Sequence, residues 1–170
     1  MTGPATGVAF DGAHFRRVLS HFPTGVVVVT AICADSAPAG MAVGSFTSVS
    51  LDPPLVAYLP SAGSSSFPRI RTAESFCVNV LADDQQAVCR TFAASGGDKF
   101  AGIEWSENGW GAPRLAGAAA WIDCALESVT EAGDHFFVLG RVLELHAPGE
   151  RAPLVFCRNG YGSFHPHPGR

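Results

Sequence analysis

Residues 40–56 read GMAVGSFTSVSLDPPLV, and this stretch decides the fold. Its first half alternates small or hydroxyl residues with larger ones, which is typical of an extended strand with two different faces. The following Asp52-Pro53-Pro54 ends that strand because proline lacks an amide donor. Residues 55–59 predict the returning strand, and residues 61–66 read SAGSSS, where hydroxyls and unhindered amides could surround an anion. Such a strand pair is suited to a flat ligand with a phosphate tail.

The composition is that of one folded domain spanning residues 1–170, with loose tails expected at residues 1–10 and 164–170. Hydrophobic residues make up 47% of the chain and charged residues 15%, which argues against disorder. The net charge of −4 gives no support for a nucleic-acid partner. The longest β-branched run, residues 26–29, is far shorter than the ~20 apolar residues that cross a bilayer, and no signal peptide is visible.

The five cysteines are widely spaced and form no CxxC pair, so no zinc site or dithiol redox motif is expected. We interpret them as reduced, mostly buried thiols of a cytoplasmic protein. The low charged fraction also suits a surface that is buried by oligomerisation.

Patterning predicts a mostly β protein with a few helices. Helices are expected at residues 11–22 (capped by Asp11), 67–73 and 83–94 (capped by Asp83), and strands at 24–32, 40–51, 55–59, 76–81, 121–130, 135–146 and 153–157. Residues 101–113 are expected to be irregular, and residues 159–162 to form a tight turn. Because hairpins outnumber βαβ units, the prediction is an antiparallel barrel.

The familiar nucleotide and hydrolase motifs are missing. Gly109-Trp110-Gly111 begins like GxGxxG, but Arg114 stands where the third glycine belongs, and neither GxxxxGK nor GxSxG occurs. The candidate phosphate-binding residues are two serine groups and one cation, namely Ser48, Ser50, Ser64, Ser65, Ser66 and Lys99. They could equally be ordinary loop and strand serines. His135, in Gly133-Asp134-His135, could meet a substrate or be a surface histidine on a polar turn.

Six segments together resemble one family. These are residues 22–30 (FPTGVVVVT), 40–56, 76–81 (FCVNVL), 98–102 (DKFAG), 133–136 (GDHF) and 153–156 (PLVF). In this order they resemble the short-chain flavin reductases, the reductase components of two-component flavin-dependent monooxygenases. The resemblance spans roughly residues 13–163.

The resemblance implies a flavin-binding split barrel, normally a homodimer with flavin sites near the subunit interface. The residues that would line the isoalloxazine ring, largely through backbone atoms, are Met41, Ala42, Val43, Gly44, Ser45 and Phe46. Those toward the ribityl phosphate would be Ser48, Ser50, Leu51, Ser64, Ser65, Ser66 and Lys99, with Phe100 beside Lys99. His135 would face the nicotinamide, and Tyr161 would fold toward the same pocket. Gly44 departs from relatives that often have a polar or larger residue there.

The implied activity is that of an NAD(P)H:flavin oxidoreductase, which reduces FMN or FAD and supplies it to a partner monooxygenase. We expect neither a metal site nor a membrane partner for this activity. Two alternatives stay open: a split-barrel flavoprotein that keeps its flavin and reduces another small substrate, and a non-catalytic flavin-binding protein. The sequence leaves open FMN against FAD and NADH against NADPH.

Overall fold

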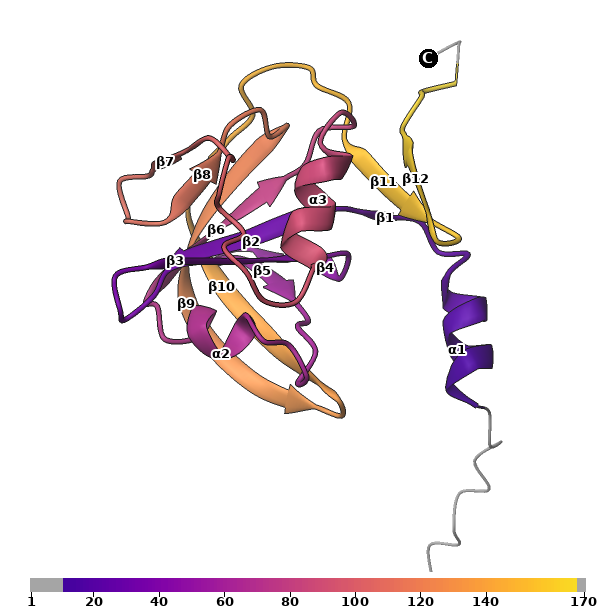
Figure 1. Cartoon of the computed structure of the whole chain (residues 1–170), viewed down its shortest axis with the longest axis horizontal. Coiled ribbons are helices and arrows are strands. Elements are labelled where there is room, and N and C mark those ends of the chain that lie inside the picture. The colour runs from indigo at the N-terminus through magenta and orange to yellow at the C-terminus, as the bar shows by residue number, and fades with distance from the viewer. Residues whose placement is uncertain (1–10, 168–170) are drawn as a thin grey trace, which may run out of the picture.

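The computed structural model describes residues 11–167, and within them three helices and twelve strands form the fold (Figure 1). The elements are α1 (Gly12–Leu19), β1 (Thr24–Gly25), β2 (Val27–Ile32), β3 (Pro38–Val43), β4 (Phe46–Leu51), β5 (Pro54–Tyr58), α2 (Phe67–Ile70), β6 (Ser75–Val80), α3 (Gln86–Ala93), β7 (Trp105–Glu107), β8 (Pro113–Leu115), β9 (Ala120–Ala132), β10 (His135–His146), β11 (Leu154–Cys157) and β12 (Gly160–Ser163). None of the helices in this part of the chain has the length and apolar character of a membrane span.

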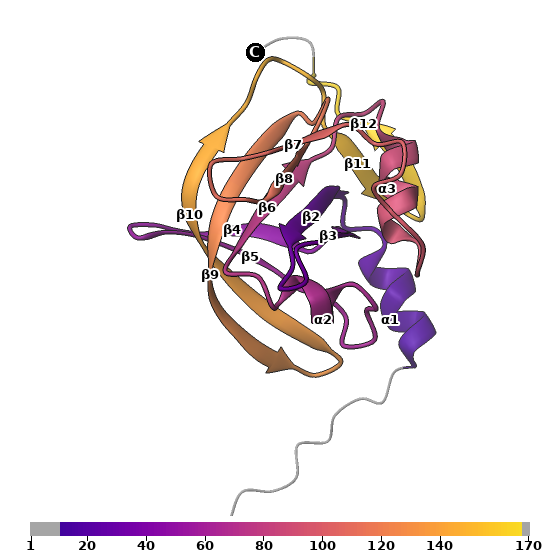
Figure 2. The ribbon, with the colours of Figure 1, turned by 60° about the vertical axis from the view of Figure 1, so that its left-hand side comes forward.

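The sheets are antiparallel throughout. Seven strands pair in the order β3-β2-β6-β9-β10-β5-β4 and curl around a core, as Figure 2 shows. A three-stranded sheet, β1-β11-β12, and the β7–β8 pair lie beside it. The mostly β class and the antiparallel split barrel predicted from the sequence are therefore confirmed.

Strand β2 is buried on both faces, which explains its run of β-branched residues. Val27 and Val29 pack in the barrel core, while Val28 packs in a second cluster that includes Phe92 of α3. Helix α3 can lie close to the neighbouring strand because Gly40 has no side chain. A Cβ atom there would lie 2.5 Å from the Phe92 ring.

Buried polar side chains attach the β7–β8 hairpin to the barrel. Asn79 donates to the Val28 carbonyl (3.1 Å) and accepts from the Leu115 amide (2.7 Å). Asp123 is completely buried and accepts hydrogen bonds from Asn108 and Arg114. Because a buried polar group without a partner is costly, these contacts determine where the hairpin lies.

Several predicted boundaries are wrong. The strand expected over residues 24–32 is two strands, because Val26 hydrogen-bonds across to β11 and bends the chain from one sheet into the other. The strand expected over residues 40–51 is interrupted after Val43, where the Ser45 hydroxyl bonds to Leu59. Helix α2 ends at Ile70, three residues before the predicted end at Ala73. Just after its last turn, the Thr72 hydroxyl donates a hydrogen bond to the Arg69 carbonyl.

Three further predictions are wrong. Residues 101–113, expected to be irregular, contain β7 and lead into β8. Asp83 does not cap α3, which begins at Gln86; its carboxylate instead accepts from the Ser163 hydroxyl (3.1 Å). Residues 160–163 form the additional strand β12, held by pairing with β11.

Other predictions are confirmed. The long hairpin of β9 and β10 is present, and Asp11 caps α1 through a bond from the His14 amide (2.6 Å). All five cysteines are free thiols and four are buried. Of the tails predicted at residues 1–10 and 164–170, residues 1–10 and 168–170 lie outside the described residues.

We predict that Gly40→Ala lowers the free energy of unfolding by about 1–3 kcal/mol, because its methyl group would overlap the buried Phe92 ring. Chemical denaturation measures this. Gly25→Ala is the matched control, since a Cβ there meets nothing within 4 Å. Equal stability of the two variants would contradict the close approach of α3 to β3.

Candidate functional site

Four cavities follow one another along β3 and the start of β4. The Trp105 cavity (about 650 Å³) adjoins residues 37–40, and the Lys99 cavity (about 240 Å³) adjoins residues 41 and 42. The Tyr161 cavity (about 170 Å³) adjoins residues 42–44, and the Phe22 cavity (about 640 Å³) adjoins residues 44–47. Successive cavities share lining residues and so adjoin one another, and we call the four together the groove.

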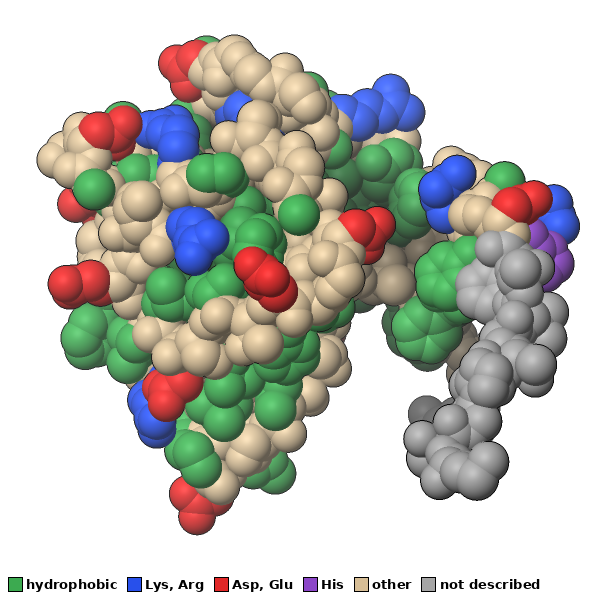
Figure 3. Space-filling model, turned by 90° about the horizontal axis from the view of Figure 1, so that it is seen from below, with side chains coloured by type: hydrophobic (Ala, Val, Ile, Leu, Met, Phe, Trp, Pro, Cys, Tyr) green, Lys and Arg blue, Asp and Glu red, His purple; other side chains and the backbone are tan. Residues whose placement is uncertain are grey.

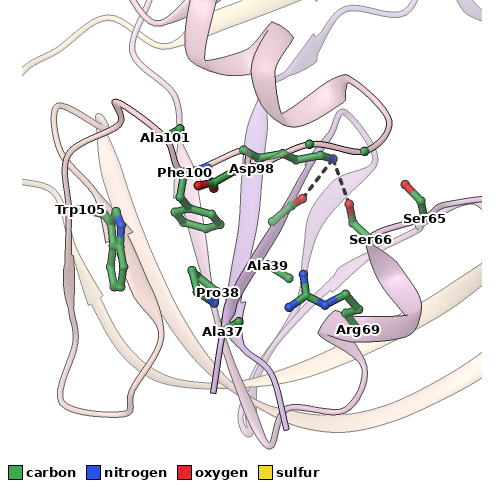
Figure 4. A pocket seen from close by; sticks show the side chains of 14 residues that line it. Ala37, Pro38, Ala39, Ser65, Ser66, Arg69, Asp98, Phe100, Ala101 and Trp105 are labelled. Carbon is green, nitrogen blue, oxygen red and sulfur yellow. Dashed lines mark hydrogen bonds between the residues drawn. The ribbon is translucent and has the colours of Figure 1, made fainter. Parts of the chain in front are cut away.

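Lys99 lies where the first two cavities meet. It is the only lysine in the sequence. Its Nζ donates to the Ser66 hydroxyl (2.9 Å), the Phe92 carbonyl (3.0 Å) and, at the long distance of 3.4 Å, the Gly40 carbonyl (Figure 4). Burial lowers the pKa of the ammonium group, because partial desolvation disfavours the charged form. An anion in the groove would reverse that penalty.

The serine loop supplies hydroxyl groups beside this lysine. The Ser64 hydroxyl accepts from the amides of Ser66 (3.3 Å) and Phe67 (3.2 Å), which fixes the loop. Ser65 and Ser66 line both the Trp105 and the Lys99 cavity. The structure thus brings together Ser64, Ser65, Ser66 and Lys99, and hydroxyls with an ammonium group are donors that suit a phosphate.

The Tyr161 cavity is mostly apolar. Ala42 and Gly44 line it, and a Cβ at Gly44 would lie 2.9 Å from Thr24 Oγ1, so a larger residue there would displace the Thr24 hydroxyl. Tyr161 closes one side: its hydroxyl lies 3.3 Å from Cys89 Sγ, a hydrogen bond that raises the pKa of the tyrosine. Such a space suits the edge or face of an aromatic ring.

The other predicted ring-lining residues differ in what they present to the groove. Met41 and Val43 are part of the barrel core, so β3 offers the groove mainly its backbone at these positions. Ser45 and Phe46 line the Phe22 cavity, and Phe46 also packs against the barrel core.

Four predicted residues are not gathered around the Lys99 cavity in this single chain. Ser48, Ser50 and Leu51 lie on β4, in a hairpin with β5 that extends beyond the barrel (Figure 2). Leu51, near the tip, is 94% exposed. Phe100 lines the Trp105 cavity instead. The roles of these residues stay predictions.

His135 is the first residue of β10, close to the Lys99 cavity but not among the residues that line it. Its Nδ1 donates to Asp134 Oδ1 (2.7 Å), and this bond lowers the pKa of the Asp134 carboxyl group. Because the ionised carboxylate only accepts, Nε2 is the ring nitrogen left for a ligand. The Phe136 amide donates to the Pro60 carbonyl (2.9 Å), and an isolated bridge pairs His135 with Ser61, which lines the Lys99 cavity.

Comparison with known proteins agrees with this geometry. The family described as "flavin reductase like domain" matches residues 19–165. The chain belongs to this family. It is 53% identical over 156 residues to a flavin reductase of Pseudomonas putida, with 92% of each chain covered. It is 45% identical to the flavin-dependent monooxygenase reductase subunit HsaB of Rhodococcus jostii, covering 96% of this chain and 84% of the relative.

A solved structure is similar over almost the whole chain. The Streptomyces globisporus NADH:FAD oxidoreductase SgcE6, determined with NAD and FAD fragments, superposes with a TM-score of 0.87 at 36% identity. The match covers 94% of this chain and 96% of that one.

The residues of this flavin reductase-like chain fit a flavin. The donors around Lys99 suit the ribityl phosphate, and the adjoining Tyr161 cavity offers a mostly apolar lining to the ring. Sequence reasoning missed Trp105 and Cys89 in the groove. Trp105 was assigned to irregular chain, and the contact of Cys89 with Tyr161 joins residues 72 positions apart, which no local pattern signals.

We predict that Lys99→Met weakens FMN binding by about 10- to 100-fold, because a charge-assisted hydrogen bond to phosphate is lost. Riboflavin, which lacks the phosphate, is the matched ligand and should bind the variant and the parent equally. Flavin fluorescence titration measures both. FMN affinity of the parent should also fall as the pH rises toward the lowered pKa of Lys99. An equal loss for both ligands would contradict a phosphate contact.

Proposed function

We propose that this protein is an NADH:flavin oxidoreductase that reduces FMN or FAD and supplies the reduced flavin to a partner monooxygenase. The observation that carries this proposal is that the phosphate-binding donors of the Lys99 cavity adjoin the mostly apolar Tyr161 cavity along β3. The named activities of the similar proteins support it: flavin reductase, monooxygenase reductase subunit and NADH:FAD oxidoreductase.

The chain's contribution to the reaction is binding and orientation. A bound flavin supplies the hydride acceptor, so the protein needs few catalytic side chains. Lys99 and the serine loop would hold the phosphate, while the β3 backbone and Tyr161 would position the ring. Asp134 fixes the tautomer of His135, whose Nε2 then accepts a hydrogen bond from the nicotinamide amide.

Oxidation of NADH or NADPH, followed by absorbance with and without added FMN or FAD, tests this function. Oxidation that depends on added flavin and saturates with it is the expected result. His135→Ala should raise the KM for NADH about three- to tenfold, the loss of one hydrogen bond, and change flavin affinity less. His146→Ala, at the opposite end of β10, is the control. Flavin binding without oxidation of either nucleotide would sink the reductase assignment and favour a binding protein.

We also propose that the protein is a homodimer. None of the residues of α1 is buried, yet its apolar residues share one face and the helix lies away from the barrel (Figure 1). The exposed apolar residues of this segment are Phe15, Val18, Leu19 and Phe22. Figure 3 shows apolar side chains on the side of α1 that faces the barrel, and Leu19 and Phe22 line the Phe22 cavity there. A second copy that covers this face would remove it from water.

Light scattering of the purified protein should give twice the mass of the chain, and Leu19→Glu should shift it toward one chain because a carboxylate would be buried. Ala13→Glu, on the opposite side of α1, should leave the mass unchanged. A single-chain mass for the parent protein would rule out the dimer.

A further inference from the structure

A further cavity lies outside the groove, between the β7–β8 hairpin and the start of β9. We call it the Trp121 cavity. Its volume of about 710 Å³ falls in the range of about 300–1,000 Å³ typical of small-molecule sites. Of the described residues that line it, Trp105 alone also lines the groove. An occupant of the Trp121 cavity would therefore lie apart from the phosphate-binding residues.

Two partly buried indoles form the walls of the Trp121 cavity. Trp121 donates from Nε1 to the Leu115 carbonyl (3.0 Å) and stacks on the His146 ring, with centroids 5.8 Å apart. Trp105 packs edge-on against Phe100, with centroids 5.7 Å apart. These contacts hold both rings in place without a ligand. The face of an indole carries a negative potential, which attracts a cation.

The charges around the Trp121 cavity are negative in balance. Arg114 lines it, but its guanidinium already donates to Asp123 and to Glu144 (2.8 Å), two carboxylates for one positive charge. Glu104 also lines the cavity and adds another carboxylate. An anionic ligand would meet more negative than positive charge here. A cationic ligand would be attracted both by the carboxylates and by the indoles.

We propose that the Trp121 cavity binds a small organic cation of the alkylated or quaternary ammonium class, with its alkyl groups against Trp105 and Trp121 and Glu104 as the counter-ion. The apolar walls favour this class over a metal ion or a bare ammonium ion, because alkyl groups on the nitrogen weaken its hydration and bury against the rings. The inference goes beyond the proposed function, since it concerns a second site with its own ligand.

Isothermal titration calorimetry of the parent protein with choline tests the site. The matched ligand is the neutral isostere of choline, in which a carbon atom replaces the nitrogen. Choline should bind at least about fivefold more tightly than this isostere, the effect of the positive charge at an aromatic wall. Choline should still bind in the presence of saturating FAD. No choline binding, equal binding of the two ligands or displacement of choline by FAD would overturn the proposal.

Two variants with matched controls locate the site. Glu104→Gln should weaken choline binding about three- to tenfold, whereas Glu107→Gln, on the same hairpin but outside the cavity, should not. Trp121→Leu should weaken it about five- to tenfold, and Trp110→Ala, an exposed tryptophan outside the cavity, is its control.

Glu104→Gln keeps the test valid if Trp121→Leu misfolds, because Glu104 has an exposed side chain. Equal losses in Glu104→Gln and Glu107→Gln would contradict a specific counter-ion and overturn the proposal. Flavin-dependent NADH oxidation is measured separately, so a failure here leaves the reductase assignment unchanged.

Discussion

The close contact between Gly40 and Phe92 is the constraint on which the groove depends. Since no side chain stands on β3 at this position, the Phe92 ring lies directly against the strand and brings α3 with it. The end of α3 then presents the Phe92 carbonyl to Lys99, and Lys99 in turn reaches Ser66 at the start of α2. Three segments distant in sequence are thus linked through one ammonium group. A larger residue at position 40 would separate them.

The hairpin that provides Trp105 is held by polar rather than apolar contacts. Asp123 is completely buried and accepts hydrogen bonds from Arg114 and Asn108. Asn79 bonds to the backbone of β2 at Val28 and of β8 at Leu115. A buried ion pair adds little net stability compared with apolar packing, but removal of one partner is costly. These hydrogen bonds therefore fix the position of the β7–β8 hairpin and, with it, of Trp105 in the wall of the Trp105 cavity.

The sequence was sufficient for the barrel, while the roles of the candidate site residues stay predictions. Alternation, proline positions and the long hairpin predicted most strands, and the serine loop with Lys99 was correctly expected to gather, because these signals are local or belong to a recognisable set of motifs. The β7–β8 hairpin was missed because its strands have three residues each and owe their place to Asn79 and Asp123, far away in sequence. The structure of one chain does not bring Ser48 and Ser50 to the Lys99 cavity, since they lie on a hairpin that extends beyond the barrel.

The presence of a single lysine has a practical side. Amine-directed reagents, whether used to attach a dye, to cross-link or to fix the protein to a support, find only one internal target, and that target lies in the groove. The lowered pKa of Lys99 increases the share of reactive free amine at a given pH. Acetylation of this side chain would remove the cation from the groove. A labelling reaction that leaves the activity of most proteins unchanged would therefore weaken ligand binding in this one.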